Sequence, residues 1–209
     1  MAVRTPTTPT FGGTPLISEV LAATASGTRG TRATLDLRTA DGAWIYAFIG
    51  RLANTTPSRS SYISCRPTFN NGLVVSTAKY DIVNQGPTTA CTATAVAAGG
   101  ASASQNFVDV TSTTSFAVGD TIFLGDSGNL RCQWNRVFAV VSATRLALEY
   151  DLRTALLQND VVSNLADTRH FFIPGGDIYE FRAFNNSASA TLSQAFRVEY
   201  ALLPGDTIV

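Results

Sequence analysis

A serine nucleophile is the first chemistry that this sequence suggests, through the pentapeptide GDSGN at residues 125–129. The same GDSG surrounds the nucleophile of trypsin-like proteases, in which the histidine base precedes the serine in the chain. The only histidine here, His170, follows Ser127, and Asn129 stands where a G-x-S-x-G motif needs glycine. Glycine, aspartate and serine are also the residues that a hairpin turn prefers. We therefore expect a turn at this place and no nucleophile.

The candidate metal ligands are poorly grouped. His170 has no second histidine and no close carboxylate pair in the sequence, so we expect it to be a residue at the start of a strand. Three aspartates, Asp109, Asp120 and Asp126, fall in turns, but their spacing is not that of an EF-hand loop. An adventitious calcium ion is the only metal that this pattern leaves open.

Three cysteines, Cys65, Cys91 and Cys132, are far apart in the sequence and show no zinc-binding spacing. Their odd number argues against a complete disulfide framework, so we expect buried free thiols. The first residues lack the apolar core of a signal peptide, and no run reaches the roughly 18 apolar residues of a membrane span. These observations predict synthesis in a cytoplasm and no membrane partner.

Paired carboxylates for glycoside hydrolysis do not stand out among the four glutamates, Glu19, Glu149, Glu180 and Glu199, although distant strands can bring such a pair together. No phosphate-binding GxGxxG or GxxxxGK motif occurs. Asn54 and Asn185 begin N-glycosylation tripeptides, which we interpret as turns. We therefore expect no catalytic, cofactor-binding or metal-binding residues, no cofactor, and a protein that is not an enzyme.

Four aromatic residues, Trp44, Tyr46, Trp134 and Tyr150, could line a sugar-binding face. Aromatic side chains on alternate strand faces more often pack into a core. A solvent-exposed Trp44 or Trp134 in a groove would favour the carbohydrate hypothesis, and two fully buried tryptophans would count against it.

The charge pattern narrows the classes of partner. The chain has 209 residues and no net charge, which removes the electrostatic case for nucleic-acid binding. Only 14% of the residues are charged, which suits either a surface covered by neighbouring subunits or an ordinary threonine-rich β protein. Lys79 is the only lysine beside fourteen arginines, a preference typical of protein interfaces and also of a GC-rich genome.

Short segments of alternating apolar residues at 8–12-residue spacing predict an all-β fold, with a sandwich or barrel architecture. Residues 31–38 and 43–50 form the best hairpin of the sequence, and the second of these segments is apolar on both faces, as a central strand is. Residues 61–69 and 73–83 follow as strands around the turn at Asn71-Gly72. Pro67 predicts that its strand lies at an edge or ends early.

The strands before and after residues 105–162 share arginines and aromatic residues, which indicates one sandwich split by an insertion. The predicted fold is a jelly-roll-like β-sandwich with an inserted small β-barrel-like module, in which residues 154–162 form the only helical turn. The predicted parts are an extended arm at 1–14, a sandwich at 15–87 plus 166–202, the module at 88–165 and a tail at 203–209.

The central segment resembles a small β module that recurs in structural proteins of tailed bacteriophages. Phe116, Val118, Gly119 and Asp120 match its first signature, residues 137–148 match its second, and Asn159-Asp160-Val161 closes it. Gln133 departs from the pattern, because a glutamate is commoner at that place. The resemblance covers about a quarter of the chain and says nothing of catalysis.

The resemblance implies a virion component that is made in the bacterial cytoplasm. The leading hypothesis is a non-enzymatic capsid decoration or cement protein that acts as a homo-oligomer and contacts phage capsid or neck and tail proteins. The alternatives are a neck or tail accessory and an adhesion module that binds host glycan. Residues 1–14 and 203–209 are expected to tie subunits together.

Overall fold

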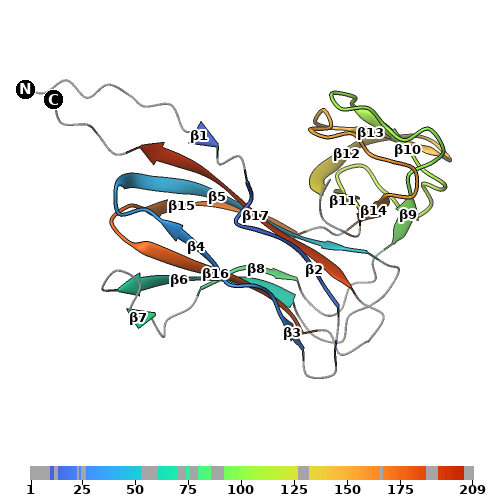
Figure 1. The fold of residues 1–209 in the computed structure, drawn as a ribbon. Helices are drawn as coiled ribbons and strands as arrows, with labels where there is room; N and C mark the ends of the chain where they lie inside the picture. The colour runs from blue at the N-terminus through green and yellow to red at the C-terminus, as the bar shows by residue number, and fades with distance from the viewer. Residues whose placement is uncertain are drawn as a thin grey trace, which may run out of the picture.

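The computed structural model describes most of the chain. The described residues are 10–11, 14–22, 24, 27–52, 61–69, 74–75, 80–85, 92–126, 132–164, 167–186 and 193–204. They contain 17 strands and no helix. The strands form three sheets (Figure 1). All pairings between the described strands are antiparallel. The predicted all-β fold class, a sandwich with an inserted small β module, is confirmed.

Two of the sheets, A and B, form the sandwich. Each is built around long central strands, which are rich in apolar residues. Sheet A has the order β1-β17-β5-β15, and β2 also pairs with β17. Its strands are β1 (Thr10–Phe11), β2 (Ile17–Leu21), β5 (Ala40–Arg51), β15 (Asp167–Pro174) and β17 (Gln194–Pro204). Sheet B is built around β16 and β6. Its strands are β3 (Thr28–Arg29), β4 (Ala33–Asp36), β6 (Ser61–Phe69), β7 (Val74–Val75), β8 (Tyr80–Gln85) and β16 (Ile178–Asn185).

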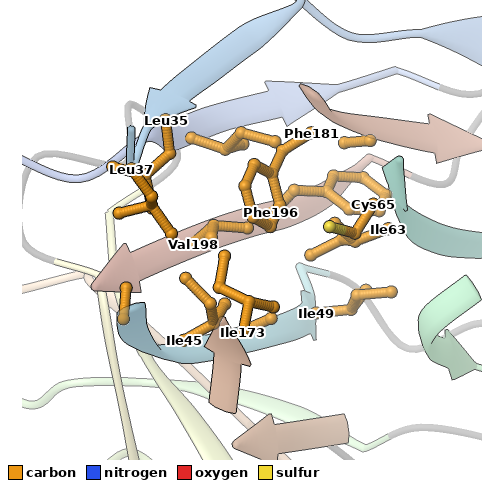
Figure 2. Packing of buried hydrophobic residues seen from close by; sticks show 14 of the residues in the cluster. Leu35, Leu37, Ile45, Ile49, Ile63, Cys65, Ile173, Phe181, Phe196 and Val198 are labelled. Carbon is orange, nitrogen blue, oxygen red and sulfur yellow. The ribbon is translucent and has the colours of Figure 1, made fainter. Parts of the chain in front are cut away.

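The main core lies between these two sheets (Figure 2). Ile45 and Ile49 of β5 and Phe196 of β17 contribute side chains from sheet A, and none of the three is exposed to solvent. Ile63 and Phe181 face them from sheet B and are equally buried. Each fully buried apolar side chain of this size stabilises the fold by about 1.5–3 kcal/mol relative to an exposed one.

The predicted hairpin between residues 31–38 and 43–50 is wrong. β4 pairs with β16 in sheet B, whereas β5 pairs with β15 and β17 in sheet A. The two segments therefore cross from one sheet to the other and face each other through the core, where Leu35 and Leu37 are buried. Alternation identifies a half-buried strand but does not say which strand it pairs with. The central position of β5 was predicted correctly.

Pro67 does not place its strand at an edge. β6 pairs with β16 along residues 62–68, and it pairs on its other side with β8 and then β7. Among the described residues, Arg66 and Pro67 are the two inner positions of β6 with no partner on that second side. Pro67 lies opposite Tyr179 of β16, so the proline stands inside a paired strand and does not end it.

The third sheet, hereafter the module, has six strands in the order β10-β13-β12-β11-β14-β9. They are β9 (Ala93–Ala95), β10 (Phe107–Asp109), β11 (Thr121–Gly125), β12 (Gln133–Ser142), β13 (Arg145–Leu148) and β14 (Val161–Asn164). The sheet curls until its two ends meet at a bridge between Val96 and Val110. Its own core contains Ile122, Leu146 and Val162, all without exposed surface.

Two turns of the module have the same construction. In one, Asp120 Oδ2 accepts a hydrogen bond of 2.9 Å from Ala117 N, and in the other Asp160 Oδ2 accepts one of 2.9 Å from Leu157 N. The residue before each aspartate has a positive φ, +90° at Gly119 and +70° at Asn159. Each turn leads into one of two strands, β11 and β14, which pair with each other.

The helical turn predicted over residues 154–162 is therefore wrong. An aspartate that accepts from the amide three residues earlier, with a left-handed residue before it, closes a single turn and then releases the chain into a strand. A bridge between Ala101 and Leu156 precedes this turn.

Several predictions fall outside the described residues. They are the turn at Asn71-Gly72, most of the GDSGN turn, the two boundaries of residues 88–165, and most of the arm and tail. Thr10 and Phe11 of the arm pair with Leu202 and Ala201 of β17 in the same chain.

Candidate functional site

The outer face of sheet A is the surface on which the parts of the protein meet. Residues that lie opposite each other in an antiparallel pair point to the same face. Ile45 and Ile49 of β5 point into the core. Side chains alternate along a strand, so Trp44, Tyr46 and Phe48 of β5 lie on the outer face. Their partners on β17 include Arg197 and Glu199, and their partners on β15 are Phe172, His170 and Thr168.

The module covers one end of this outer face through an apolar contact. Phe48 and Ala195 of sheet A form a buried cluster with Phe123 and Cys132 of the module. Gly50 is required at this contact, since a Cβ there would lie 2.3 Å from Phe123 Cδ2. The Phe123 ring therefore lies directly on the backbone of β5, and the module is seated against the sandwich by close packing.

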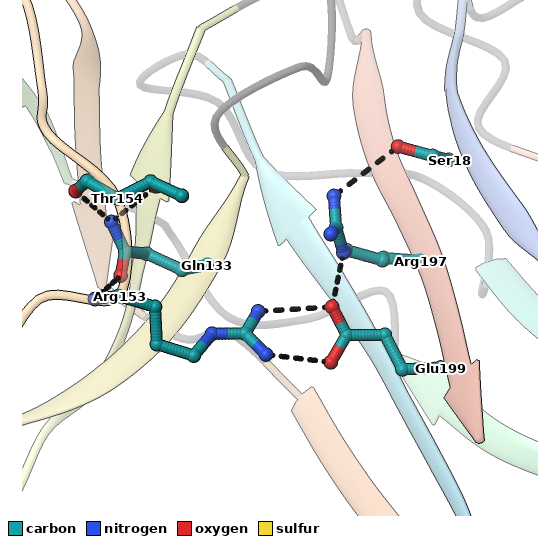
Figure 3. A network of polar contacts seen from close by, with 6 residues as sticks. All are labelled: Ser18, Gln133, Arg153, Thr154, Arg197 and Glu199. Atoms are coloured by element: carbon teal, nitrogen blue, oxygen red, sulfur yellow. Dashed lines mark hydrogen bonds and ion pairs between the residues drawn. The ribbon is translucent and has the colours of Figure 1, made fainter. Parts of the chain in front are cut away.

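Charged side chains complete the junction beside the apolar contact (Figure 3). Arg153 of the module donates two hydrogen bonds to Glu199 of β17, at 2.8 and 2.9 Å. Arg197 donates to the same carboxylate at 2.7 Å and also reaches Ser18 of β2 at 3.3 Å. One carboxylate therefore accepts from two guanidinium groups, one on each side of the junction. Bidentate geometry makes this the strong form of the arginine–carboxylate contact.

The carboxylate of Glu199 stays ionised at this place. Burial by itself raises its pKa, but the hydrogen bonds and charges of Arg153 and Arg197 outweigh burial and leave the pKa below the ordinary value of 4.5. In return, the hydrogen bond to Glu199 raises the pKa of Arg153. The junction therefore contains a permanent charge network under ordinary conditions.

The loop that carries Arg153 is held by a side-chain amide of β12. Gln133 Nε2 donates to the carbonyl oxygen of Thr154 at 3.0 Å, and Gln133 Oε1 accepts from the amide of Arg153 at 2.8 Å. A carboxylate could accept the second bond but could not donate the first. A glutamine at position 133 thus fits the contact observed here.

The other end of the outer face carries an exposed group of rings. Trp44 is 38% exposed and makes an edge contact with Phe172, which is 42% exposed, at a centroid distance of 5.5 Å. Tyr46 and His170 stack at 6.4 Å. We call these four residues the aromatic face. Trp134 lies at the junction, packs against the Phe48 cluster and contacts Tyr150, so the four predicted aromatics do not share one face.

The residues considered for metal binding are scattered in the structure. His170 stands at the fourth position of β15 and not at its start. Asp109 forms a bidentate pair with Arg145 at 2.6 and 2.7 Å, which lowers the pKa of Asp109, and Asp120 closes a turn. Among the described residues, no group of three His, Cys, Asp or Glu side chains could hold a metal ion.

The four glutamates lie in four different settings. Glu180 is buried and pairs with Arg32 at 3.1 Å, and Glu149 pairs with Arg136 at 3.3 Å. Glu19 accepts from the amide of Thr31 at 3.0 Å, while Glu199 belongs to the junction. Each of the four glutamates therefore has a partner of its own within the chain.

The prediction of buried thiols outside disulfides is confirmed for two of the three cysteines. Cys65 lies in the sandwich core and Cys132 at the junction, and neither forms a disulfide. Burial raises the pKa of each thiol to about 12. Cys91 lies outside the described residues.

A second exposed apolar group lies on β12, and reasoning from sequence missed it. The register of β12 against β13 shifts between Val137 and Ala139 and again between Val140 and Ser142. Phe138 and Val141 therefore have no residue opposite them on β13, as in a β-bulge, and they are 68% and 59% exposed. The alternating pattern of this strand hides both shifts, since every residue from 137 to 141 is apolar.

No family model matches this chain, and no curated protein is similar to it. No helix that could cross a membrane is found in the described part of the chain.

Proposed function

We propose that this chain is a non-enzymatic structural protein of a tailed-bacteriophage virion, which acts through contacts between copies and with the particle. Capsid decoration or cement is the preferred role, ahead of a neck or tail accessory. The proposal rests on one observation, which is where the residues of the phage-like signatures lie in the module. The residues of the phage-like signatures, Gly119-Asp120 and Asn159-Asp160, form its two equivalent turns, and the second signature forms the β12–β13 pair.

The junction supports a structural role for the module. A module that is packed on β5 through Phe123 and fixed by Arg153 and Glu199 presents its surface in one orientation relative to the sandwich. A component that must fit a repeating particle needs such a fixed geometry, because every copy must offer the same surfaces. The scattered carboxylates and histidine support the absence of catalysis in this proposal.

The test is the location of the protein in particles. Antibodies raised against the purified chain should label tailed particles from an infected culture, and particles made without its gene should lose stability to heat or low salt. Absence of the protein from purified particles would contradict the proposal. A chain without residues 1–14 should still fold, because the described part of that arm contributes one two-residue strand, Thr10–Phe11, at the edge of sheet A, but it should show lower occupancy.

Binding to host glycan is the second candidate, and the exposed Trp44 favours it. Exposed rings can stack on the apolar face of a sugar. Glycan-array binding by the wild-type protein that is lost in Trp44→Ser would support this function over the structural one.

A further inference from the structure

We propose that the outer face of sheet B binds an acidic protein surface through four arginines that are grouped there. These residues, which we call the arginine face, are Arg29, Arg32, Arg66 and Arg182. The inference deepens the virion role proposed above, because it names the surface that meets the particle and the charge of the partner. It rests on that role for its biological meaning.

The register of sheet B places the arginines on one face. Phe181 of β16 lies in the sandwich core, so its neighbours Glu180 and Arg182 point outward. Arg66 of β6 lies directly opposite Glu180 and therefore points the same way. The module is seated on sheet A, so this face lies on the opposite side of the sandwich from the module (Figure 1).

The other two arginines come from the segment on the far side of β16. Arg29 of β3 lies opposite Phe184, which is the outward residue of β16 after Arg182. Arg32 precedes β4 and reaches across to Glu180, with its Nε 3.1 Å from the carboxylate. Both Arg29 and Arg32 are exposed. The arginine face therefore spans three neighbouring segments of sheet B.

The carboxylates that the structure describes on this face do not neutralise its positive charge. Glu180 stands among the arginines and is only 3% exposed. Asp36, at the end of β4, is held by Arg38 through bonds of 2.9 and 3.1 Å. Even when Asp81 of β8, a strand paired with β6, is counted with Glu180, four guanidinium groups stand against two carboxylates. The chain has no net charge, so this face is a local concentration of positive charge.

The arginine face keeps hydrogen-bond donors for a partner. A guanidinium group has five N–H donors in a planar fork that matches a carboxylate. Arg182 uses its Nε to donate to the carbonyl oxygen of Gly30 at 2.9 Å, which holds the side chain in place. In the described part of the chain, the side chains of Arg29 and Arg66 form no hydrogen bond or ion pair. Carboxylates of a partner fit these donors.

An acidic protein fits this face better than a nucleic acid does. A nucleic acid presents a continuous row of phosphate charges, and Glu180 would repel such a row at the centre of the face. The neighbouring rings of Tyr62 and Phe184 stack on each other at 4.6 Å, and Phe184 is 8% exposed, so they do not offer a platform for bases. Separate carboxylates on a protein can contact the arginines and avoid Glu180, and arginine is enriched in protein interfaces.

Two charge-matched double variants test this proposal. The face variant is Arg29→Gln with Arg66→Gln, two residues for which no side-chain bond is described. The control variant is Arg136→Gln with Arg169→Gln, two exposed residues outside sheet B. Both variants should keep the wild-type circular dichroism. Arg29→Gln alone removes only an exposed side chain, so it keeps the test valid if the double variant unfolds.

The first measurement is the binding of poly-L-glutamate in a titration at low salt. Wild type and control should bind, with an affinity that falls as salt is added. Arg29→Gln should bind about threefold more weakly and the face variant about tenfold more weakly. Absence of binding by wild type, or equal binding by the face and control variants, would overturn the proposal. Tighter binding of duplex DNA that the face variant loses would assign the face to nucleic acid and overturn it too.

The second measurement separates this proposal from the virion role. Wild-type and control chains that are added to particles made without the gene should restore occupancy, and the face variant should need about tenfold more protein. If the face variant rebinds as well as wild type does, the arginine face is overturned and the virion role stands. If wild type is absent from natural particles, the virion role fails, and the poly-L-glutamate titration alone decides whether the face binds acidic protein.

Discussion

Arg153 of the module and Glu199 of β17 form a bidentate ion pair across the junction, with N–O distances of 2.8 and 2.9 Å. The carboxylate is 20% exposed and the guanidinium 55% exposed, so water screens the pair only in part. Arg197 shares the same carboxylate from the sandwich side. The pair therefore links two sheets that share no strand, and it is the polar counterpart of the contact between Phe123 and Gly50.

The first prediction concerns the energy of this pair. A double-mutant cycle with Arg153→Ala and Glu199→Gln should give a coupling free energy of about 1 kcal/mol, at the upper end for partly exposed pairs. The control is a cycle on Arg136 and Glu149, whose side chains are 47% and 36% exposed, and its coupling should be close to zero. Urea denaturation measures both. Equal couplings in the two cycles would show that the junction pair has no special role.

The second prediction follows from the lowered pKa of Glu199. A carboxylate with a depressed pKa in the folded state stabilises the fold above its unfolded pKa, and that contribution disappears as pH falls through the folded value. Glu199→Gln should therefore be less stable than wild type at neutral pH, and the difference should vanish in acid, well below pH 4.5. Denaturation curves at a series of pH values test this. A stability difference that persists unchanged in acid would contradict it.

The third prediction concerns the close packing at the junction. Gly50→Ala places a Cβ within 2.3 Å of the Phe123 ring and should cost about 1–3 kcal/mol through overpacking. Phe123→Ala should cost about 3–5 kcal/mol because it leaves a cavity. The double variant should lose less than the sum, since the alanine occupies part of the space that the ring leaves. Strict additivity would show that the two residues do not touch.

The fourth prediction concerns the two aspartate turns. Asp160→Ala should destabilise the module by about 1–2 kcal/mol, because the amide of Leu157 loses its acceptor. Asp120→Ala should cost less, since Asp120 is more exposed than the buried Asp160. Asn159→Gly should be neutral or slightly stabilising at a φ of +70°, whereas Gly119→Ala should destabilise at +90°. Melting temperatures of the four variants check the order.

The fifth prediction concerns thiol reactivity. In a Cys91→Ser variant, Cys65 and Cys132 should not react with a thiol reagent at pH 8, because both are buried and their pKa values are raised to about 12. Both should react in denaturant. Rapid labelling of the native variant would show that the core or the junction opens readily.

The sequence by itself determined the strands and the faces that they bury. Patterning located strands at residues 31–38 and 61–69, which are β4 and β6, and a run of apolar residues identified β5 as central, because side chains alternate between two faces along a strand. The Gly119-Asp120 pair identified one turn of the module. Residues 154–162 were wrongly predicted as a helical turn. The adjacent Leu156 and Leu157 before a turn are compatible with a helix and with a strand, and the local sequence does not distinguish the two.

Tertiary structure alone decided which strands are neighbours and where the module is seated. β4 and β5 are consecutive in the sequence yet lie in different sheets, because each finds a better partner among later strands. Phe123 stands in an apolar run of the sequence, but only the tertiary structure shows that its ring packs on Gly50. Arg153 and Glu199 are 46 residues apart, and no spacing rule joins them. Contacts of this kind depend on how whole sheets pack, which a pattern confined to one strand does not contain.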